Sequence, residues 1–426
     1  MIPKNLYALD LGTTKFCIAR LKKDDDDAFP SIETVHVKAD GMHRGMLSDM
    51  SLACKVLEEL VEKAESKFSR DIHQVVVGVA GSHLAGKVIH SKIRIPSAVV
   101  EPDLLRLLKD QAVCDHREAL REIIHCVPLE YKLDNREWIK SPTGFSGEFL
   151  HGRFFIMQAD KHYLADIIQL CNQVGLEVKR LIAEPFASAA VTSSTEAKNL
   201  GVAIADIGGG TTDGIIFREE MPIGAFTINI GGKLMTKDLS IGLALPYEEA
   251  EKVKRHYGLS HTSNGNALLN FENDSLSQKD DFFVVKDIYG KAKPISYRNV
   301  FPILAPRIDE LGILLEKELH PYLSNLGAGL LLTGGGSELK GICEYYASMD
   351  IGRIDKIKPR FSEHLEKHLE SKINSSEKTK LASKFATVSG LLYLEIIQLI
   401  EERKFRKVKW LGQYFNQFVN WLKELS

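Results

Sequence analysis

The feature that most constrains this chain is a glycine- and threonine-rich turn near its middle. Residues 205–213 have the sequence Ala-Asp-Ile-Gly-Gly-Gly-Thr-Thr-Asp, and apolar stretches at 201–204 and 214–217 flank them. This pattern predicts a β-hairpin. Glycine lets consecutive backbone N–H groups approach a ligand closely and form an anion-binding concavity. Asp206 ends the incoming strand, where a carboxylate can hold a metal ion through water. The alternative is an ordinary tight turn.

Two other segments repeat the pattern. Residues 6–19 contain an apolar strand, a turn and a second apolar strand, and the turn carries Asp10, Gly12, Thr13, Thr14 and Lys15. Its distance of about 200 residues from the central turn suggests two similar halves that present their hairpins to one cleft. A third loop, Gly334-Gly335-Gly336-Ser337, follows another apolar strand, and Ser337 is predicted to cap a helix after it. None of these loops has the P-loop or dinucleotide-binding spacing.

Composition limits the class of protein. The chain has 426 residues, 44% of them hydrophobic and 26% charged, which suits a globular protein of two large domains or several small ones. The net charge of −2 provides no field that would favour nucleic acid, so no nucleic-acid partner is expected. Six scattered cysteines show no metal-ligand or C-x-x-C spacing, which favours the reducing cytosol. No signal peptide and no run of about 18 apolar residues is present.

Together these loops resemble the actin-like ATPase superfamily. Within it, segments 78–83, 142–147, 184–189 and 231–233 occur in the order and context seen in the FtsA family of bacterial cell-division proteins, and the similarity spans roughly residues 5–426. The resemblance implies an α/β fold with two related lobes around a nucleotide cleft, a small inserted α+β subdomain and a C-terminal amphipathic helix.

The predicted division of the chain follows from this resemblance and from the alternation of strand and helix patterns. The expected parts are lobe 1 core, 1–84 and 156–198; an inserted α+β subdomain, 85–155; lobe 2 core, 199–231 and 306–380; an outer small lobe, 232–305; a C-terminal helix of lobe 1, 381–402; and a basic linker with a membrane helix, 403–426.

The resemblance also assigns roles to individual residues. ATP is expected between the hairpins, with Mg²⁺ near Asp10 and Asp206. The residues expected to bind the nucleotide are Gly12, Thr13, Thr14, Lys15, Gly208, Gly209, Gly210, Thr211, Thr212, Glu251, Lys254, Gly334, Gly335, Gly336 and Ser337. Glu251 and Lys254 would border the adenosine, although their spacing alone equally fits a solvated ion pair.

Glu184 precedes Pro185, a residue that favours the first turn of a helix. From the sequence alone, this carboxylate either stabilises the helix N-terminus or orients an attacking water. The resemblance favours the second role, because actin-like ATPases carry Glu or Gln at this position. It leaves open whether hydrolysis is slow and ATP acts mainly as a conformational ligand.

The C-terminal segment is amphipathic at helical spacing. Its apolar positions include Trp410, Leu411, Phe415, Phe418, Trp421, Leu422 and Leu425, and a basic cluster over 403–409 precedes all of them. This pattern suits a helix in the membrane interface, with docking on the protein core as the alternative. The spacer before it is short for the family.

The resemblance therefore implies an ATP-binding, self-associating protein that tethers the tubulin-like protein FtsZ to the cytoplasmic face of the inner membrane at the division septum by binding the C-terminal tail of FtsZ. Expected partners are FtsZ, further copies of the chain, other division proteins and an anionic membrane surface. The alternatives are a small-molecule kinase, which would need a substrate pocket with an Asp base, and a pilus-assembly ATPase of the same superfamily.

Overall fold

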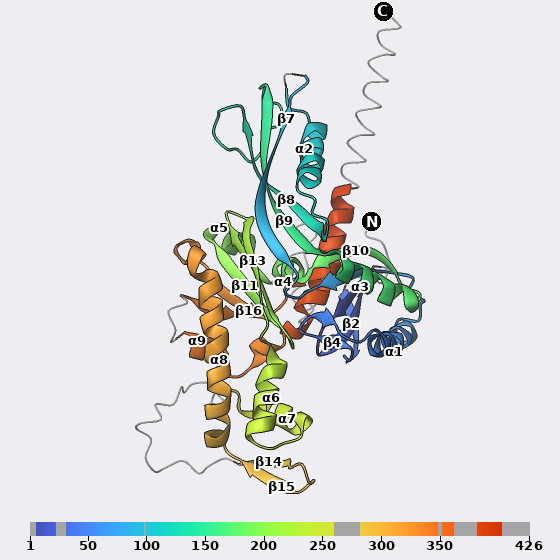
Figure 1. Cartoon of the computed structure of the whole chain (residues 1–426), viewed down its shortest axis with the longest axis vertical. Helices are drawn as coiled ribbons and strands as arrows, with labels where there is room; N and C mark the ends of the chain where they lie inside the picture. Colours follow the sequence, from blue (N-terminus) through green and yellow to red (C-terminus); the bar gives the residue numbers. More distant parts are fainter. Residues whose placement is uncertain are drawn as a thin grey trace, which may run out of the picture.

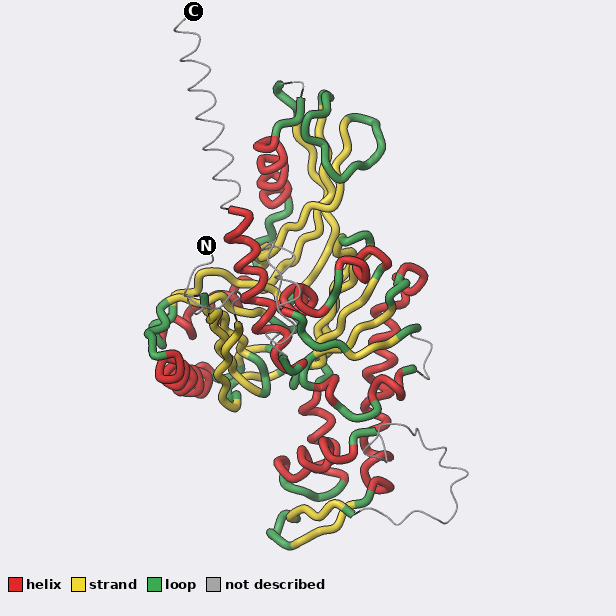
Figure 2. Tube along the Cα trace, turned by 180° about the vertical axis from the view of Figure 1, so that it is seen from behind, coloured by secondary structure: helices red, strands yellow, loops and turns green. Residues whose placement is uncertain are grey.

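The computed structural model describes residues 6–22, 31–97, 99–259, 282–347, 352–361 and 381–402. Two five-stranded sheets form its centre, and smaller groups of elements extend from opposite ends (Figure 1, and from behind in Figure 2). The acidic run at 24–27 and the whole C-terminal segment 403–426, including its predicted membrane-facing side chains, lie outside the described residues.

The first sheet has the strand order β10–β6–β1–β2–β3. Its strands are β1 (Tyr7–Leu11), β2 (Lys15–Lys22), β3 (Ser31–Lys38), β6 (Gln74–Val79) and β10 (Glu177–Ala183). β1, β2 and β3 pair antiparallel, whereas β1, β6 and β10 pair parallel. Helices α1 (Met50–Phe68) and α3 (Lys161–Gln173) cover one face, and α4 (Glu184–Thr192) with the helix over 386–402 covers the other.

The second sheet repeats the first strand for strand. Its order is β13–β12–β11–β16–β17, with strands β11 (Val202–Ile207), β12 (Thr212–Arg218), β13 (Met221–Ile228), β16 (Gly329–Thr333) and β17 (Ile354–Lys356). The parallel and antiparallel pairs fall at the same places as in the first sheet. The prediction of two similar halves is confirmed. The charged stretch 353–378 predicts only a loop, but β17 lies within it.

Helix α1 shows how local sequence sets these elements. By residue type either Ser48 or Asp49 could cap this helix, and the structure has Asp49 in that role: its side chain accepts the backbone N–H of Leu52 at 2.9 Å. The helix then buries Ala53, Leu57 and Ala64 against the first sheet. The helical spacing of Leu52, Val56, Leu60 and Ala64 predicts that they share the buried face, but Leu52 is 41% exposed, because the buried stripe lies one residue further along.

Helix α8 (Tyr297–Leu319) begins earlier than predicted. The sequence pattern predicts a helix from Pro302 to Leu323, but a capping box between Ser296 and Asn299 begins the helix five residues before that proline. Pro302 and Pro306 therefore lie inside the helix. The helix runs from the outer elements to the second sheet and belongs to one continuous core with both (Figure 1). The 3₁₀ turn His320–Asn325 continues it.

At one end of the molecule, β7 (Ala85–Arg94), β8 (Arg121–Leu133) and β9 (Phe149–Asp160) form a separate sheet in the order β7–β9–β8. Helix α2 (Pro102–Asp115) packs on one face of it and begins at Pro102, since proline is favoured in the first turn of a helix. At the other end lie α6 (Gly232–Gly242), α7 (Tyr247–Tyr257), β14 (Phe283–Lys286) and β15 (Ala292–Ile295) (Figure 1). The amphipathic pattern of this segment predicts Ile241 on the apolar face of α6 with Leu234 and Leu239, but its side chain is 71% exposed.

The last described helix belongs to the core of the first half. Among the described residues, the segment Ser383–Glu402 is the one helical stretch long and apolar enough to cross a membrane. However, 61% of its most apolar part is buried inside the protein. Val388, Leu391, Leu392 and Ile396 pack against the first sheet and α4. A glycine within this apolar helical stretch predicts a point of close approach, and the structure confirms it: a Cβ on Gly390 would stand 1.8 Å from Ala187 O.

Candidate functional site

The turns of the two predicted hairpins meet between the sheets. Asp10 pairs with Cys17 across β1 and β2, and Asp206 pairs with Asp213 across β11 and β12, so each turn starts at an Asp. A Cβ on Gly210 would lie 2.7 Å from Thr13 Oγ1. The turns are therefore in van der Waals contact, and only a residue without a side chain fits at this point.

The third glycine loop closes against the second hairpin. A Cβ on Gly334, whose φ is +83°, would stand 2.0 Å from Asp206 Oδ1, and one on Gly336 would stand 2.3 Å from Ile207 Cγ2. The structure thus brings all three loops together.

The predicted cap at Ser337 is wrong. Its buried hydroxyl donates to Gly334 O at 2.8 Å and so closes the loop on itself instead of capping a helix. A 3₁₀ turn, Gly336–Glu338, follows, and α9 (Ile342–Tyr346) begins only after Gly341. The hydroxyl bonds backward because Ser337 lies inside a tight turn, where no free helix N–H groups face it.

Three aspartates with separate partners line the hairpins. Asp10 forms an ion pair with Lys15 at 3.0 Å. Asp206 Oδ2 accepts hydrogen bonds from Ser188 at 2.5 Å and from Thr387 at 3.2 Å. The carboxylate of Asp213 accepts from Thr211 at 2.6 Å and from Thr227 at 2.7 Å.

Glu184 is the first residue of α4, as predicted, with Pro185 in the first turn. Its side chain lies beside Gly78, where a Cβ would stand 2.9 Å from Glu184 Oε1. Burial, and then the nearby charges of Asp10, Asp213 and Asp206, raise the pKa of the Glu184 carboxyl well above its ordinary value.

The same crowding of negative charge affects two other groups. Burial, with added repulsion from Asp213 and Asp10, raises the pKa of Asp206 to about 6. For Lys15, burial opposes the charged form, but the attractions of Asp10 and of the other nearby negative groups, Asp206 among them, together outweigh it, and the ammonium pKa lies above its ordinary value. The site therefore holds more buried carboxylate than its own cation neutralises.

A divalent cation would fit this imbalance. Within the part of the chain that is described, no three His, Cys, Asp or Glu side chains converge as a ligand set. Asp10 and Asp206 could therefore supply at most two protein ligands. Such a set suits Mg²⁺, which usually takes one or two carboxylates and completes its shell with waters and phosphate oxygens.

Glu251 and Lys254 lie on α7, next to the start of α6. Lys254 is only 9% exposed, and its ammonium donates to Gly232 O at 3.0 Å and Thr236 Oγ1 at 2.8 Å and pairs with Glu251 at 2.7 Å. This is a buried network and not a solvated pair. It connects to the second hairpin because the Gly232 N–H donates to Gly208 O at 2.9 Å.

Sequence reasoning assigned no role to four polar residues of this site: Ser188, Asp213, Thr227 and Thr387. Two had usable signals, since Asp213 ends the turn motif and Ser188 follows Glu184 by one helical turn. Thr227 and Thr387 come from distant segments and carry no local signal.

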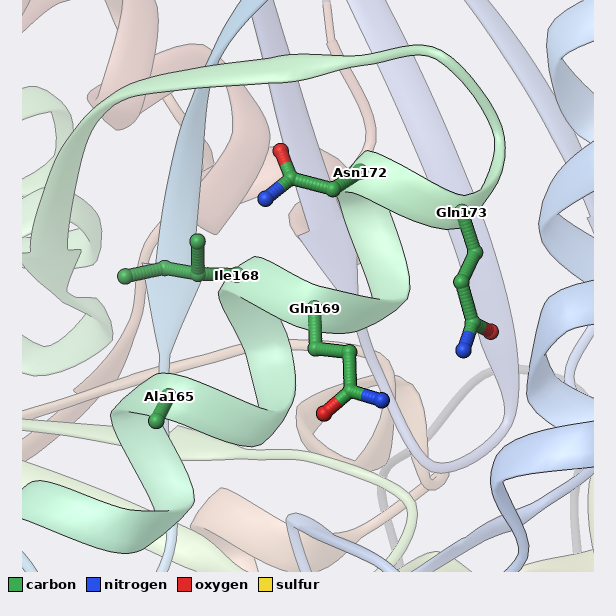
Figure 3. A pocket seen from close by; sticks show the side chains of 5 residues that line it. All are labelled: Ala165, Ile168, Gln169, Asn172 and Gln173. Atoms are coloured by element: carbon green, nitrogen blue, oxygen red, sulfur yellow. The ribbon is translucent and has the colours of Figure 1, made fainter.

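A second surface feature lies elsewhere. Ala165, Ile168, Gln169, Asn172 and Gln173, all on α3, line a depression on the outer surface of that helix (Figure 3). None of the predicted site residues contributes to it, and a single helix supplies every side chain. We therefore place the candidate site at the three loops.

Two sheets of identical topology, each with an Asp-glycine hairpin at the junction between them, define an actin-like fold. Solved structures agree. A PilM–PilN type IV pilus biogenesis complex matches with a TM-score of 0.60 at 16% identity, over 92% of this chain and 99% of the other. MreB5 of Spiroplasma citri bound to ADP matches with a TM-score of 0.52 at 14% identity, over 95% and 98% of the two chains.

The family is set by sequence comparison. The family model for cell division protein FtsA matches residues 203–390, and that for the SHS2 domain inserted in FtsA matches residues 81–158. Cell division protein FtsA of Pseudomonas aeruginosa is 26% identical over 80% of both chains, and that of Buchnera aphidicola is 24% identical over 99% of this chain and 98% of its own. The chain belongs to the FtsA family of cell-division proteins.

Proposed function

We propose that this chain binds ATP with Mg²⁺ between its two halves, assembles into filaments and tethers FtsZ to the membrane during division. The observation that carries the nucleotide part is the convergence of three glycine loops on a cluster of buried carboxylates. Backbone N–H groups of the two hairpin turns would face the phosphates. The third loop, with Glu251 and Lys254 on the other side of the second hairpin, would border the adenosine.

The hydrogen bonds that Lys254 already makes restrict its role beside the adenosine. Gly232 O, Thr236 and Glu251 already use its three N–H donors. In our proposal Lys254 therefore supports the start of α6 and the hairpin behind it, and Glu251 is the better candidate for direct contact with the nucleoside.

Mg²⁺ would be held by Asp10 and Asp206, and its charge would neutralise phosphate oxygens during phosphoryl transfer. Glu184 can orient a water only when it is ionised, and burial among carboxylates opposes this. A cation at Asp10 and Asp206 would lower the Glu184 pKa toward its ordinary value. We propose that hydrolysis, where it occurs, is slow and that ATP serves mainly as a conformational ligand.

The division role rests on family membership. We propose that the FtsZ C-terminal tail, further copies of this chain and other division proteins are its partners. The segment 403–426 would hold the chain at the cytoplasmic face of the inner membrane at the septum. The division of the chain into two lobes, an inserted subdomain and an outer lobe remains part of this proposal.

Two measurements test these points. Thermal unfolding with and without Mg·ATP tests the nucleotide site, and we expect protection in wild type and none in Asp206→Ala, which should remain folded. Electron microscopy on an anionic lipid monolayer with ATP, with and without a peptide of the FtsZ tail, tests the adaptor role. Filaments on the lipid support it, whereas transfer of phosphate from ATP to a sugar or acyl acceptor would favour the kinase alternative.

A further inference from the structure

A small hairpin packs against both phosphate turns. It consists of β4 (Met42–His43) and β5 (Met46–Leu47), joined by Arg44 and Gly45. The Gly45 N–H donates to Thr13 Oγ1 of the first turn at 3.0 Å. A Cβ on Gly210 of the second turn would lie 2.9 Å from Arg44 Cα. The two-residue turn is therefore held where the halves of the molecule meet.

The backbone at Arg44 is unusual. Its φ is +48° and that of Gly45 is +73°, as a two-residue hairpin turn requires. Asparagine, aspartate or glycine normally occupies the first position of such a turn, and a long side chain there is strained. Strained residues of this kind persist where surrounding contacts hold them, and they cluster at functional sites.

The Arg44 turn lies at the Glu184 end of the site. The Tyr163 hydroxyl donates to Gly45 O at 2.9 Å. Burial, and then the nearby charge of Glu184, raise the pKa of the Tyr163 phenol, so Tyr163 lies close to Glu184 as well. Gly45 also lies close to Gly81, because a Cβ added to Gly45 would stand 3.1 Å from Gly81 Cα. Glu251 and Lys254 lie beyond the second hairpin, at the start of α6.

The Glu184 end of the site carries a surplus of negative charge that a further cation would balance. Four carboxylates crowd the site, and the ammonium of Lys15 is already paired with Asp10. Arg44 is exposed, and in the described part of the chain its guanidinium forms no ion pair or hydrogen bond. A polyphosphate would add negative charge to this surplus. The planar guanidinium matches phosphate oxygens in charge and geometry.

We propose that Arg44 binds the terminal phosphate of a nucleoside triphosphate and so distinguishes triphosphate from diphosphate. This rests on the proposed nucleotide site and adds to it a residue outside the glycine loops. Because the turn contacts both hairpins, a phosphate held by Arg44 would also hold the two halves together.

The test compares Arg44→Gly with wild type by calorimetric titration of a non-hydrolysable ATP analogue and of ADP, both with Mg²⁺. Glycine suits the backbone at this position, so the fold should be kept, and Arg44→Asn is a second variant that tolerates the same backbone. A lost charge-assisted hydrogen bond predicts triphosphate affinity at least about tenfold weaker, with ADP affinity nearly unchanged. Arg44→Lys should retain part of the preference, and His43→Ala, an exposed neighbour, should behave as wild type.

The proposal is wrong if Arg44→Gly and Arg44→Asn bind the triphosphate as tightly as wild type, or if triphosphate and diphosphate weaken equally. Nucleotide binding by wild type with no effect of these variants would overturn the Arg44 assignment alone. No binding of either nucleotide by wild type would overturn the proposed function and this assignment together.

Discussion

Gly209 lies directly against Thr14: a Cβ on Gly209 would stand 1.8 Å from Thr14 Oγ1 and 3.0 Å from its Cβ. This contact joins the turn of one half to the turn of the other, although 195 positions separate them in the chain. Glycine is therefore needed at position 209 for the contact between the two turns, as well as for the proposed phosphate binding.

We expect Gly209→Val to push the two turns apart and to abolish the thermal protection given by Mg·ATP. Gly209→Ala should destabilise the protein without nucleotide by about 1–3 kcal/mol, as overpacking usually does. Adding Thr14→Ala removes the nearest atom and should recover part of this loss, which a double-mutant cycle by chemical denaturation would measure. Gly335→Ala, where a Cβ has 3.7 Å of room, is the steric control for the stability measurement made without nucleotide. Normal nucleotide protection of Gly209→Val would contradict the hairpin assignment.

Asp206 makes stability depend on pH. Its pKa in the folded protein is about 6, above the ordinary value of an aspartate, so protonation of Asp206 favours folding of the protein without nucleotide. This contribution is complete below about pH 4 and is lost as the pH rises through 6, and it amounts to about 1–3 kcal/mol. Asp206→Asn cannot ionise and keeps an oxygen to accept the bonds of Ser188 and Thr387.

The variant should therefore gain stability over wild type as the pH rises from 4.5 to 7.5, a difference that urea unfolding at both values would show. Glu62→Gln, at an exposed position on α1, controls for general charge effects. A constant difference between Asp206→Asn and wild type across this range would contradict the raised pKa.

Gly390 tests the packing of the last described helix on α4. A Cβ there would lie 1.8 Å from Ala187 O and 2.3 Å from its carbonyl carbon. Alanine favours a helix over glycine by about 1 kcal/mol, so intrinsic propensity alone predicts a more stable protein. We expect the contact to dominate and Gly390→Ala to be destabilised by about 1–3 kcal/mol.

The same change should weaken Mg·ATP binding, because Thr387 of this helix donates to Asp206. Guanidinium unfolding and nucleotide titration measure the two effects, and Glu401→Ala, exposed on the same helix, is the control. A variant with increased stability would show that the helix can move away from α4 without loss.

The strands and turns of the site could be predicted because each carries its signal locally. An apolar strand ending in Asp and then glycine specifies β1 and β11, and Glu184 with Pro185 marks the start of α4. The buried faces were less certain, since Leu52 and Ile241 fit an apolar stripe but face outward. A helical pattern fixes which residues share a face more reliably than which face is covered.

What could not be predicted depends on distant segments. Thr387 reaches Asp206 across 181 positions, and Lys254 donates to Gly232 O from another helix. Ser337 has the position of a helix cap, but its burial redirects the hydroxyl to Gly334 O. Arg44 becomes notable only when the tertiary structure sets its turn against Gly210.

The C-terminal segment supports a prediction from the sequence alone. Each basic residue near an anionic surface contributes about 1 kcal/mol, and the apolar face adds burial at about 25 cal/mol per Å². Ordering the helix offsets part of this, so one segment should hold a monomer weakly. We expect Trp421→Glu, which places a charge in the apolar face, to release the protein from anionic liposomes in co-sedimentation. Asn420→Glu adds the same charge on the polar face and should leave most binding intact.

Assembly should strengthen this weak attachment. A filament presents many C-terminal segments at once, so after the first has bound, the others bind at high effective concentration. A variant that cannot self-associate but keeps residues 403–426 should therefore bind liposomes far more weakly than wild type at equal concentration, and raising the salt should widen the gap. Retention of Trp421→Glu would mean that the segment docks on the protein core. Equal binding by monomer and filament would show that one segment suffices and that multivalency adds nothing.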